Sequence, residues 1–303
     1  MFATELLSKE EIRRFSVRSN WSALRMVLGN WFIIAGVFAV VAFWTNPVTI
    51  FLAILVFGGR QLSLDVLVHD CGHSSMFTRW KWNRFVAEWL AAPFVFSHAK
   101  SYRLKHGKHH RLGGTANDPD LQNYINYAVA RKSLMRKVAR DLTGITGIKI
   151  LRLSVKALGP AVLVYWVLAN LFLFGILYST GNGILYWLWP AAWLTSHMLV
   201  LRIRQAAEHA AVPDLFDPDP RKHTRTTYAR WWERLLLAPN FVNYHLEHHI
   251  LPTVPCYRLR EFHDYLMAKG HLEDAKFCDG YWNVVKQLVL PPGIVKEQST
   301  MPT

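Results

Sequence analysis

The chain has 303 residues, of which 51% are hydrophobic and only 18% are charged. A charged fraction below the roughly 25% of ordinary soluble domains favours a membrane protein and argues against a disordered or collagen-like chain. The net charge of +14 indicates an anionic membrane surface or nucleic acid as a partner, and three scattered cysteines exclude a disulfide scaffold.

After a polar N-terminal segment, 1–25, four apolar stretches are each close to the ~20 residues that cross a hydrocarbon core. They cover 26–44, 48–68, 161–178 and 184–201. The second stretch contains Arg60, and we expect its helix to leave the bilayer there and continue into water.

The basic residues indicate how the spans are oriented. Both connections within the span pairs are uncharged, whereas the segment 131–156 between the pairs is rich in Lys and Arg. The positive-inside rule then predicts that both termini and this central segment are cytoplasmic. Because the charge follows topology, membrane lipids are the predicted partner and nucleic acid is not.

Eight of the 14 histidines fall into three clusters, at 69–73, 106–110 and 245–249. The first reads HDCGH and follows the second span, and the other two share the spacing HxxHH. Positions i, i+3 and i+4 lie on one face of a helix, so each cluster can direct two or three imidazoles at one point. Imidazole suits iron, copper and zinc. The predicted metal ligands are His69, His73, His106, His109, His110, His245, His248 and His249.

His209, just beyond the fourth span, is a ninth candidate ligand. Nine imidazoles exceed what one ion can hold, so their number predicts two metal ions. A metal-bound histidine normally donates its other N–H to a carboxylate or carbonyl. The acidic residues beside the clusters that could accept it are Asp70, Asp118, Asp120 and Glu247. The isolated histidines are expected to be ordinary core or surface residues: His98, His197, His223, His263 and His271.

The motifs HDCGH, HGKHH and NYHLEHHILPTVP, with the segment 110–120, resemble those of the membrane fatty acid desaturases over roughly 48–259. The resemblance implies an all-α membrane domain, 26–272, with four transmembrane helices and a cytosolic helical cap that holds two non-haem irons. It also implies a cytosolic tail, 273–303. Relatives add a histidine after the fourth span, which matches His209, and some have an Asn one turn earlier, where Gln205 stands here.

The activity that the resemblance implies is desaturation of a fatty acyl chain, presented as an acyl-lipid or acyl-CoA, with O₂ and two supplied electrons. Attack on an unactivated C–H bond needs an oxidising power that side chains lack. We expect an apolar tunnel to lead the chain to the irons, although the sequence assigns no substrate-binding residue. It shows no cytochrome b5, rubredoxin or dinucleotide-binding signature, so a separate ferredoxin, rubredoxin or cytochrome b5 is the expected donor.

The same three-cluster plan also serves membrane hydroxylases and ketolases that act on alkanes, sterols, sphingolipids or carotenoids, and this alternative stays open. A metal transporter is disfavoured because the clusters lie outside the spans, on one side. The lack of a fused domain favours a bacterial inner membrane over the endoplasmic reticulum.

Overall fold

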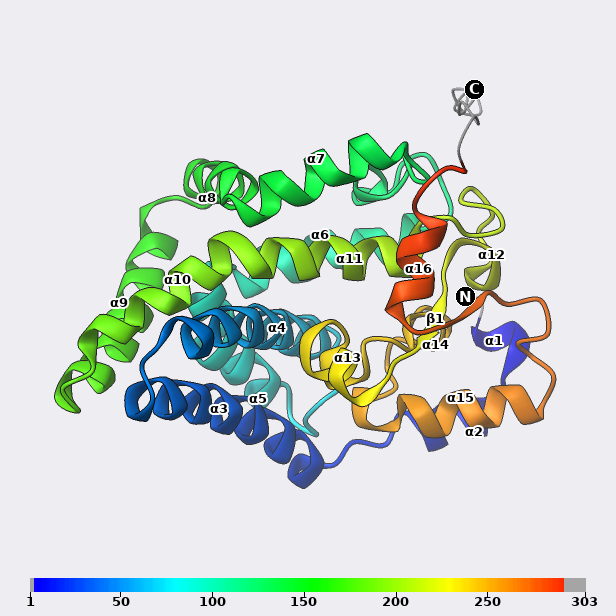
Figure 1. The fold of residues 1–303 in the computed structure, drawn as a ribbon. Helices are drawn as coiled ribbons and strands as arrows, with labels where there is room; N and C mark the ends of the chain where they lie inside the picture. Colours follow the sequence, from blue (N-terminus) through cyan, green and yellow to red (C-terminus); the bar gives the residue numbers. More distant parts are fainter. Residues whose placement is uncertain (1–2, 292–303) are drawn as a thin grey trace.

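Four helical segments long and apolar enough to cross a membrane dominate the computed structural model, which describes residues 3–291 (Figure 1). Three are continuous helices: α3 (Asn20–Phe43), α4 (Pro47–Gly72) and α9 (Pro160–Ser179). The fourth, Gly183–His209, joins the 3₁₀ turn η4 (Gly183–Trp187), α10 (Leu188–Ala192), the π-helical turn η5 (Trp193–His197) and α11 (Met198–His209). The predicted all-α membrane class is confirmed.

The ends of the spans are set by local sequence. Ser19 accepts a hydrogen bond from the Ser22 amide at the start of α3, and Asn46 caps α4 with Pro47 as its first residue. These residues satisfy or remove amide donors that have no partner within the helix. The two spans α3 and α4 can therefore form a tight hairpin.

Two glycines let α4 lie against its neighbours at backbone distance. A Cβ on Gly58 would lie 2.7 Å from the amide nitrogen of His197 in η5, and one on Gly59 would lie 2.7 Å from the Cα of Leu236. Real Cβ atoms do not come this close, so any larger residue would force α4 away from η5 or from α13 (Trp231–Leu236).

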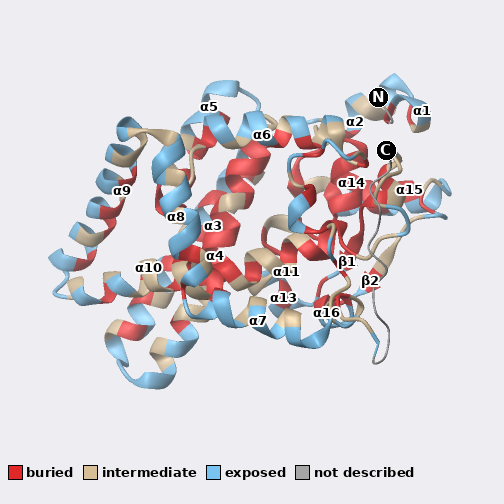
Figure 2. Cartoon of the chain, turned by 90° about the horizontal axis from the view of Figure 1, so that it is seen from above, coloured by how far each residue is buried: buried red, intermediate tan, exposed pale blue. Residues whose placement is uncertain are grey.

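The spans differ in how much of their surface the protein covers. In the apolar window of α4, 61% of residues are buried, against 22% in α9. Figure 2 shows the same contrast, with α4 mainly buried and α9 mainly exposed. Large apolar side chains such as Phe32 on α3 and Phe172 on α9 stay exposed, which suits contact with lipid.

Arg60 does not mark an exit of α4 into water, contrary to our expectation. It is only 4% exposed, and its guanidinium donates to the Asn30 side chain of α3 and to the carbonyl of Leu235. A side chain of α3 and carbonyl groups in the last turn of α13 satisfy the charge inside the protein, which is how membrane proteins tolerate such a residue.

The remaining elements connect the spans or follow the fourth one. Between α4 and α9 come α5 (Trp80–Phe85), the π turn η1 (Val86–Ala91), the 3₁₀ turn η2 (Ala92–Val95), α6 (Ala99–Leu112), η3 (Leu121–Asn123), α7 (Arg131–Leu142) and α8 (Ile145–Leu158). After α11 and before α15 come α12 (Pro220–His223), β1 (Thr226–Tyr228), α13, η6 (Pro239–Phe241), α14 (His245–Ile250) and η7 (Cys256–Arg258). The last elements are α15 (Leu259–Ala268), β2 (Phe277–Asp279) and α16 (Tyr281–Gln287).

The first helices of the chain pack against these C-terminal elements. The N-terminal segment holds α1 (Ala3–Leu6) and α2 (Lys9–Phe15), and Phe15 packs against Phe262 of α15. The strands β1 and β2 form a parallel pair with Thr226 opposite Phe277, so the start of the predicted tail is part of the fold. The part of that tail at 292–303 lies outside the described residues.

Candidate metal centre

All nine histidines singled out in the sequence come together at one end of the spans. His69 lies in the last turn of α4 and His209 is the last residue of α11. The clusters at 106–110 and 245–249 lie on α6 and α14, which pack over these ends (Figure 1). Helical spacing thus directs two imidazoles of each HxxHH cluster at one point, the first and last of the motif, while the middle histidine, His109 or His248, points to the other set of imidazoles.

The nine imidazoles form two groups, in each of which the ligand nitrogens lie within 4.8 Å of one another. We call them the five-histidine group and the four-histidine group. The first comprises His69, His73, His106, His110 and His248. The second comprises His109, His209, His245 and His249.

The spacing of the nitrogens fits metal ions better than hydrogen bonds between rings. Nε2 of His110 lies 2.9 Å from Nε2 of His106 and 3.0 Å from Nε2 of His248. One ring nitrogen has a single hydrogen or a single lone pair, so it cannot bond to both. Two nitrogens bound at ~2.1 Å to one ion and 90° apart would be separated by about 3.0 Å.

Two further observations agree with this fit. The Nε2 atoms of His69 and His73 are buried with no hydrogen-bond partner among the described residues. Burial, and then the neighbouring imidazoles, lower the pKa values of six candidate ligands well below the ordinary range. These six are His73, His106, His110, His245, His248 and His249. Neutral imidazole is the form that binds metal.

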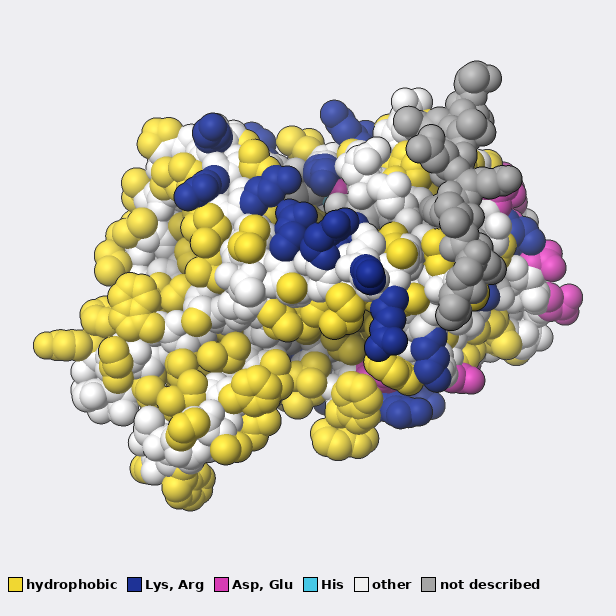
Figure 3. All heavy atoms as spheres, turned by 45° about the horizontal axis from the view of Figure 1, so that its top comes forward, with side chains coloured by type: hydrophobic (Ala, Val, Ile, Leu, Met, Phe, Trp, Pro, Cys, Tyr) yellow, Lys and Arg dark blue, Asp and Glu magenta, His cyan; other side chains and the backbone are white. Residues whose placement is uncertain are grey.

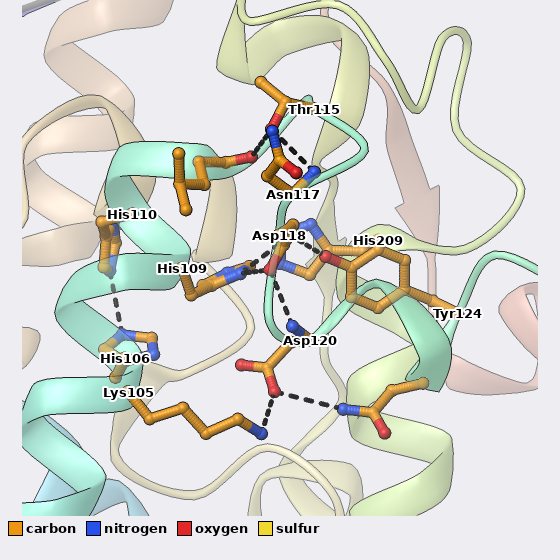
Figure 4. Close-up of polar contacts among 12 residues, drawn as sticks. Lys105, His106, His109, His110, Thr115, Asn117, Asp118, Asp120, Tyr124 and His209 are labelled. Atoms are coloured by element: carbon orange, nitrogen blue, oxygen red, sulfur yellow. Dashed lines mark hydrogen bonds and ion pairs between the residues drawn. The ribbon is translucent and has the colours of Figure 1, made fainter. Parts of the chain in front are cut away.

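Two acidic residues named from the sequence contact candidate ligands. Nδ1 of His69 lies 2.6 Å from the carboxylate of Asp70. Nδ1 of His109 lies 2.8 Å from Asp118, which also accepts a hydrogen bond from the Tyr124 hydroxyl (Figure 4). Burial alone would raise the pKa of Asp118, but the hydrogen bonds from His109 and Tyr124 hold it below its ordinary value.

Two further contacts of this kind were missed. Oε1 of Glu208 lies 3.3 Å from Nδ1 of His245, and the carbonyl of His223 lies 3.0 Å from Nδ1 of His209. Glu208 precedes His209 directly, but in sequence it looks like one more charge at a helix end. A backbone carbonyl leaves no signal in sequence.

The other named candidates contact no candidate ligand in the part of the chain that the structure describes. Asp120 forms an ion pair with Lys105, with Nζ and Oδ1 2.5 Å apart, at the edge of the cluster (Figure 4). Glu247 instead meets His263, whose Nδ1 lies 2.6 Å from its Oε1. Gln205 lines a cavity beside the histidines.

A cavity of about 330 Å³ opens against both groups, and its wall includes His69, His106, His109, His209 and His245. The rest of the wall is mainly apolar, with aliphatic side chains such as Leu62, Val66 and Leu201. It also carries charged residues, which are Asp65, Lys105, Asp120, Arg204 and Glu208. A molecule in the cavity therefore meets charged as well as apolar groups.

Comparison with known proteins identifies the family. The profile of the fatty acid desaturase family matches residues 44–279, which is most of the chain and includes all nine histidines. The chain belongs to the fatty acid desaturase family. It is also 25% identical over 247 residues to the dihydrorhizobitoxine desaturase of Bradyrhizobium elkanii, covering 73% of this chain and 67% of that protein.

Membership of the desaturase family agrees with the resemblance noted in the motifs. It indicates that the protein is a desaturase-type oxidoreductase. The two histidine groups could each hold a metal ion, and iron is the metal that the family implies. The donor set fits such an ion because imidazole nitrogens suit iron, and thiolates are absent from both groups.

Proposed function

We propose that this desaturase introduces a C=C bond into a fatty acyl chain, using O₂ and two irons held by the nine histidines. The observation that carries the proposal is the pair of converging imidazole groups beside one cavity in a chain of this family. The name of the Bradyrhizobium relative supports desaturation over hydroxylation.

The irons, when bound, supply the oxidising power that side chains lack. In the overall reaction the substrate loses two hydrogens, and O₂ takes up these, two electrons and two protons to leave as two waters. The protein holds the imidazoles neutral and oriented, through contacts such as Asp70–His69 and Asp118–His109. The cavity brings the reacting carbons to the histidine wall.

The electrons come from a separate carrier, a ferredoxin, rubredoxin or cytochrome b5. Such a protein has to reach the end of the spans at which the histidines lie. Helices α7 and α8 carry Lys and Arg, and Figure 3 shows a broken row of Lys and Arg that crosses one face among apolar side chains. The positive-inside rule supports a cytoplasmic location for these basic residues, both termini and the histidines. We place the protein in a bacterial inner membrane.

The test is to express the chain in a host that lacks desaturases and to analyse its lipids and free acids by mass spectrometry. Cells with the wild-type chain should accumulate products lighter by two hydrogens, and cells with His209→Ala should not. Purified protein should hold about two irons and should need O₂ and an added reductant. Products heavier by one oxygen would overturn the proposal in favour of a hydroxylase.

A further inference from the structure

The cavity beside the histidines has charged side chains in its mainly apolar wall, among them the ion pair of Lys105 with Asp120. Asp65 of α4 and Arg204 and Glu208 of α11 line it, together with Gln205. These charges are paired within the protein, Asp65 with His197 and Glu208 with Arg204, which lowers the cost of burying them. A site for plain hydrocarbon would still not need polar groups in its wall. They indicate that the part of the substrate nearest the histidines is polar.

Arg204 is the group best placed to bind a polar part of the substrate. The residue is 9% exposed, and its Nε lies 2.5 Å from Oε1 of Glu208. The same Glu208 oxygen lies 3.3 Å from Nδ1 of His245, so two contacts link the guanidinium to a candidate ligand. The charged end of Arg204 therefore lies close to the four-histidine group.

The Nη1 and Nη2 atoms of Arg204 form no hydrogen bond with any residue in 3–291, although the side chain lines the cavity. Glu208 compensates the charge on the Nε side, where Nε and Oε1 are 2.5 Å apart. The outer edge of the guanidinium still offers N–H donors in the planar arrangement that binds a carboxylate through both oxygens. Metal ions held by neutral imidazoles would add positive charge beside the same site.

A second hollow, of about 400 Å³, continues from the first and shares Asp65, Tyr102 and Leu201 with it. Its wall is mainly apolar, with side chains such as Phe96 and Trp193. The two hollows together suit a molecule with an acidic end near the histidines and a hydrocarbon tail that points away from them.

We propose that Arg204 binds a free carboxylate of the substrate, so that the bond which is oxidised lies near the acid end of an amphiphilic carboxylic acid. This inference rests on the proposed function only in placing the oxidation beside the two histidine groups. The substrate that we infer is a free acid, oxidised close to its carboxylate. It is not a long esterified chain that is oxidised far from its head group.

The test measures binding, which needs no turnover. Isothermal titration calorimetry on the metal-loaded full chain in lipid nanodiscs compares octanoate, its methyl ester and octyl phosphate. Wild-type protein should bind octanoate more tightly than the ester, and Arg204→Gln should weaken octanoate binding roughly ten- to a hundredfold. Arg136→Gln, which removes an exposed charge of α7 away from the cavity, should leave binding unchanged.

Arg204→Lys separates binding from support of the site. It keeps a positive charge beside Glu208 but loses the planar donor pair, so metal content should match wild type while octanoate binding weakens several-fold. If Arg204→Gln loses metal or does not fold, Arg204→Lys provides the test.

Three results would overturn the inference. They are equal binding of acid and ester by wild type, unchanged preference in the Arg204 variants, and tighter binding of octyl phosphate than of octanoate. Failure of the two proposals is distinguishable. Octanoate binding without any double-bond product contradicts only the proposed function, whereas double bonds in long esterified chains without octanoate binding contradict only this inference.

Discussion

The two histidine groups are built differently. In the four-histidine group every residue is buried, and two of the rings have Nδ1 hydrogen-bonded to an acceptor, His109 to Asp118 and His209 to a backbone carbonyl. Nδ1 of a third ring, His245, lies 3.3 Å from Glu208 without a hydrogen bond. In the five-histidine group, within residues 3–291, only His69 has such an acceptor. The first group is oriented by the surrounding protein, and the second mainly by ring-to-ring packing and by the number of its ligands.

The largest effect that tests this comparison is removal of a ligand from each group. We expect His109→Ala to lower iron from about two ions per chain to about one or fewer and to abolish activity, because three imidazoles remain in its group. His248→Ala leaves four in the other group and should lose less iron. Iron per chain is measured by plasma mass spectrometry on purified protein.

The control is His271→Ala, which removes a histidine outside both groups and should keep full iron content. Full iron in both ligand variants would show that neither group binds metal. A greater loss in His248→Ala than in His109→Ala would reverse the comparison.

The next effect concerns the acceptors. Asp118→Asn should weaken iron binding by about 10- to 100-fold, since the carboxylate supports His109 and itself is held by Tyr124. Asp70→Asn should act in the same direction on His69. Competition with a chelator gives both affinities, and Asp264→Asn, an exposed carboxylate of α15, is the matched control. Unchanged affinity in Asp118→Asn would mean that its contact does not orient the ligand.

Acid should destabilise the metal-free protein, because six candidate ligands outside the spans have pKa values lowered by burial and by one another. These groups stay neutral in the folded state, but in the unfolded chain they take up protons below a pKa of about 6.5. The unfolded state therefore binds more protons, and stability is full above that pH and falls as the pH drops below it.

The measurement is the thermal unfolding midpoint of metal-free protein between about pH 7.5 and 5.5, the window around the ordinary histidine pKa. The midpoint should fall steadily as the pH is lowered. His110→Gln, which removes one of these groups, should make the fall shallower. A midpoint that does not change across this range would show that the imidazoles are not buried as neutral groups.

The ligand clusters could be predicted from sequence because helical spacing is a local property: positions such as His245, His248 and His249 share a face in any helix. Likewise, the length and apolarity of the spans follow from the thickness of a bilayer. Residues whose role depends on distant partners could not be predicted. Arg60 is satisfied by Asn30 and by the backbone near Leu235, and nothing adjacent in sequence indicates this.

The charged cavity was missed for the same reason. Arg204 and Glu208 are four residues apart near a helix end, which in sequence is typical of a solvated ion pair. Only the packing of α4, α6 and α14 around them turns this pair into a cavity wall beside His245. The chemistry of the substrate therefore had to be inferred from the structure.

The smallest effect that we predict comes from variants around Glu247. They distinguish an acidic residue that supports a metal ligand from one that supports only the fold. Glu247 lies inside the third cluster, yet its carboxylate meets Thr226 and His263, and so joins α14 to β1 and α15. His263→Ala removes a buried charged hydrogen bond and should lower the free energy of unfolding by about 1–3 kcal/mol. Tyr228→Phe removes only the last contact in this series of hydrogen bonds, that of the Tyr228 hydroxyl, which lies 3.2 Å from Nε2 of His263. It should lower the free energy of unfolding by less than His263→Ala does.

Metal content should stay at the wild-type level in both variants, because in the described structure Glu247 contacts no member of either histidine group. Unfolding midpoints and iron per chain, measured on the same samples, test the two statements separately. Loss of iron in His263→Ala would mean that the position of α14 depends on this bond. The four-histidine group would then owe its geometry to the α14–α15 contact as well as to the acceptors of its own rings.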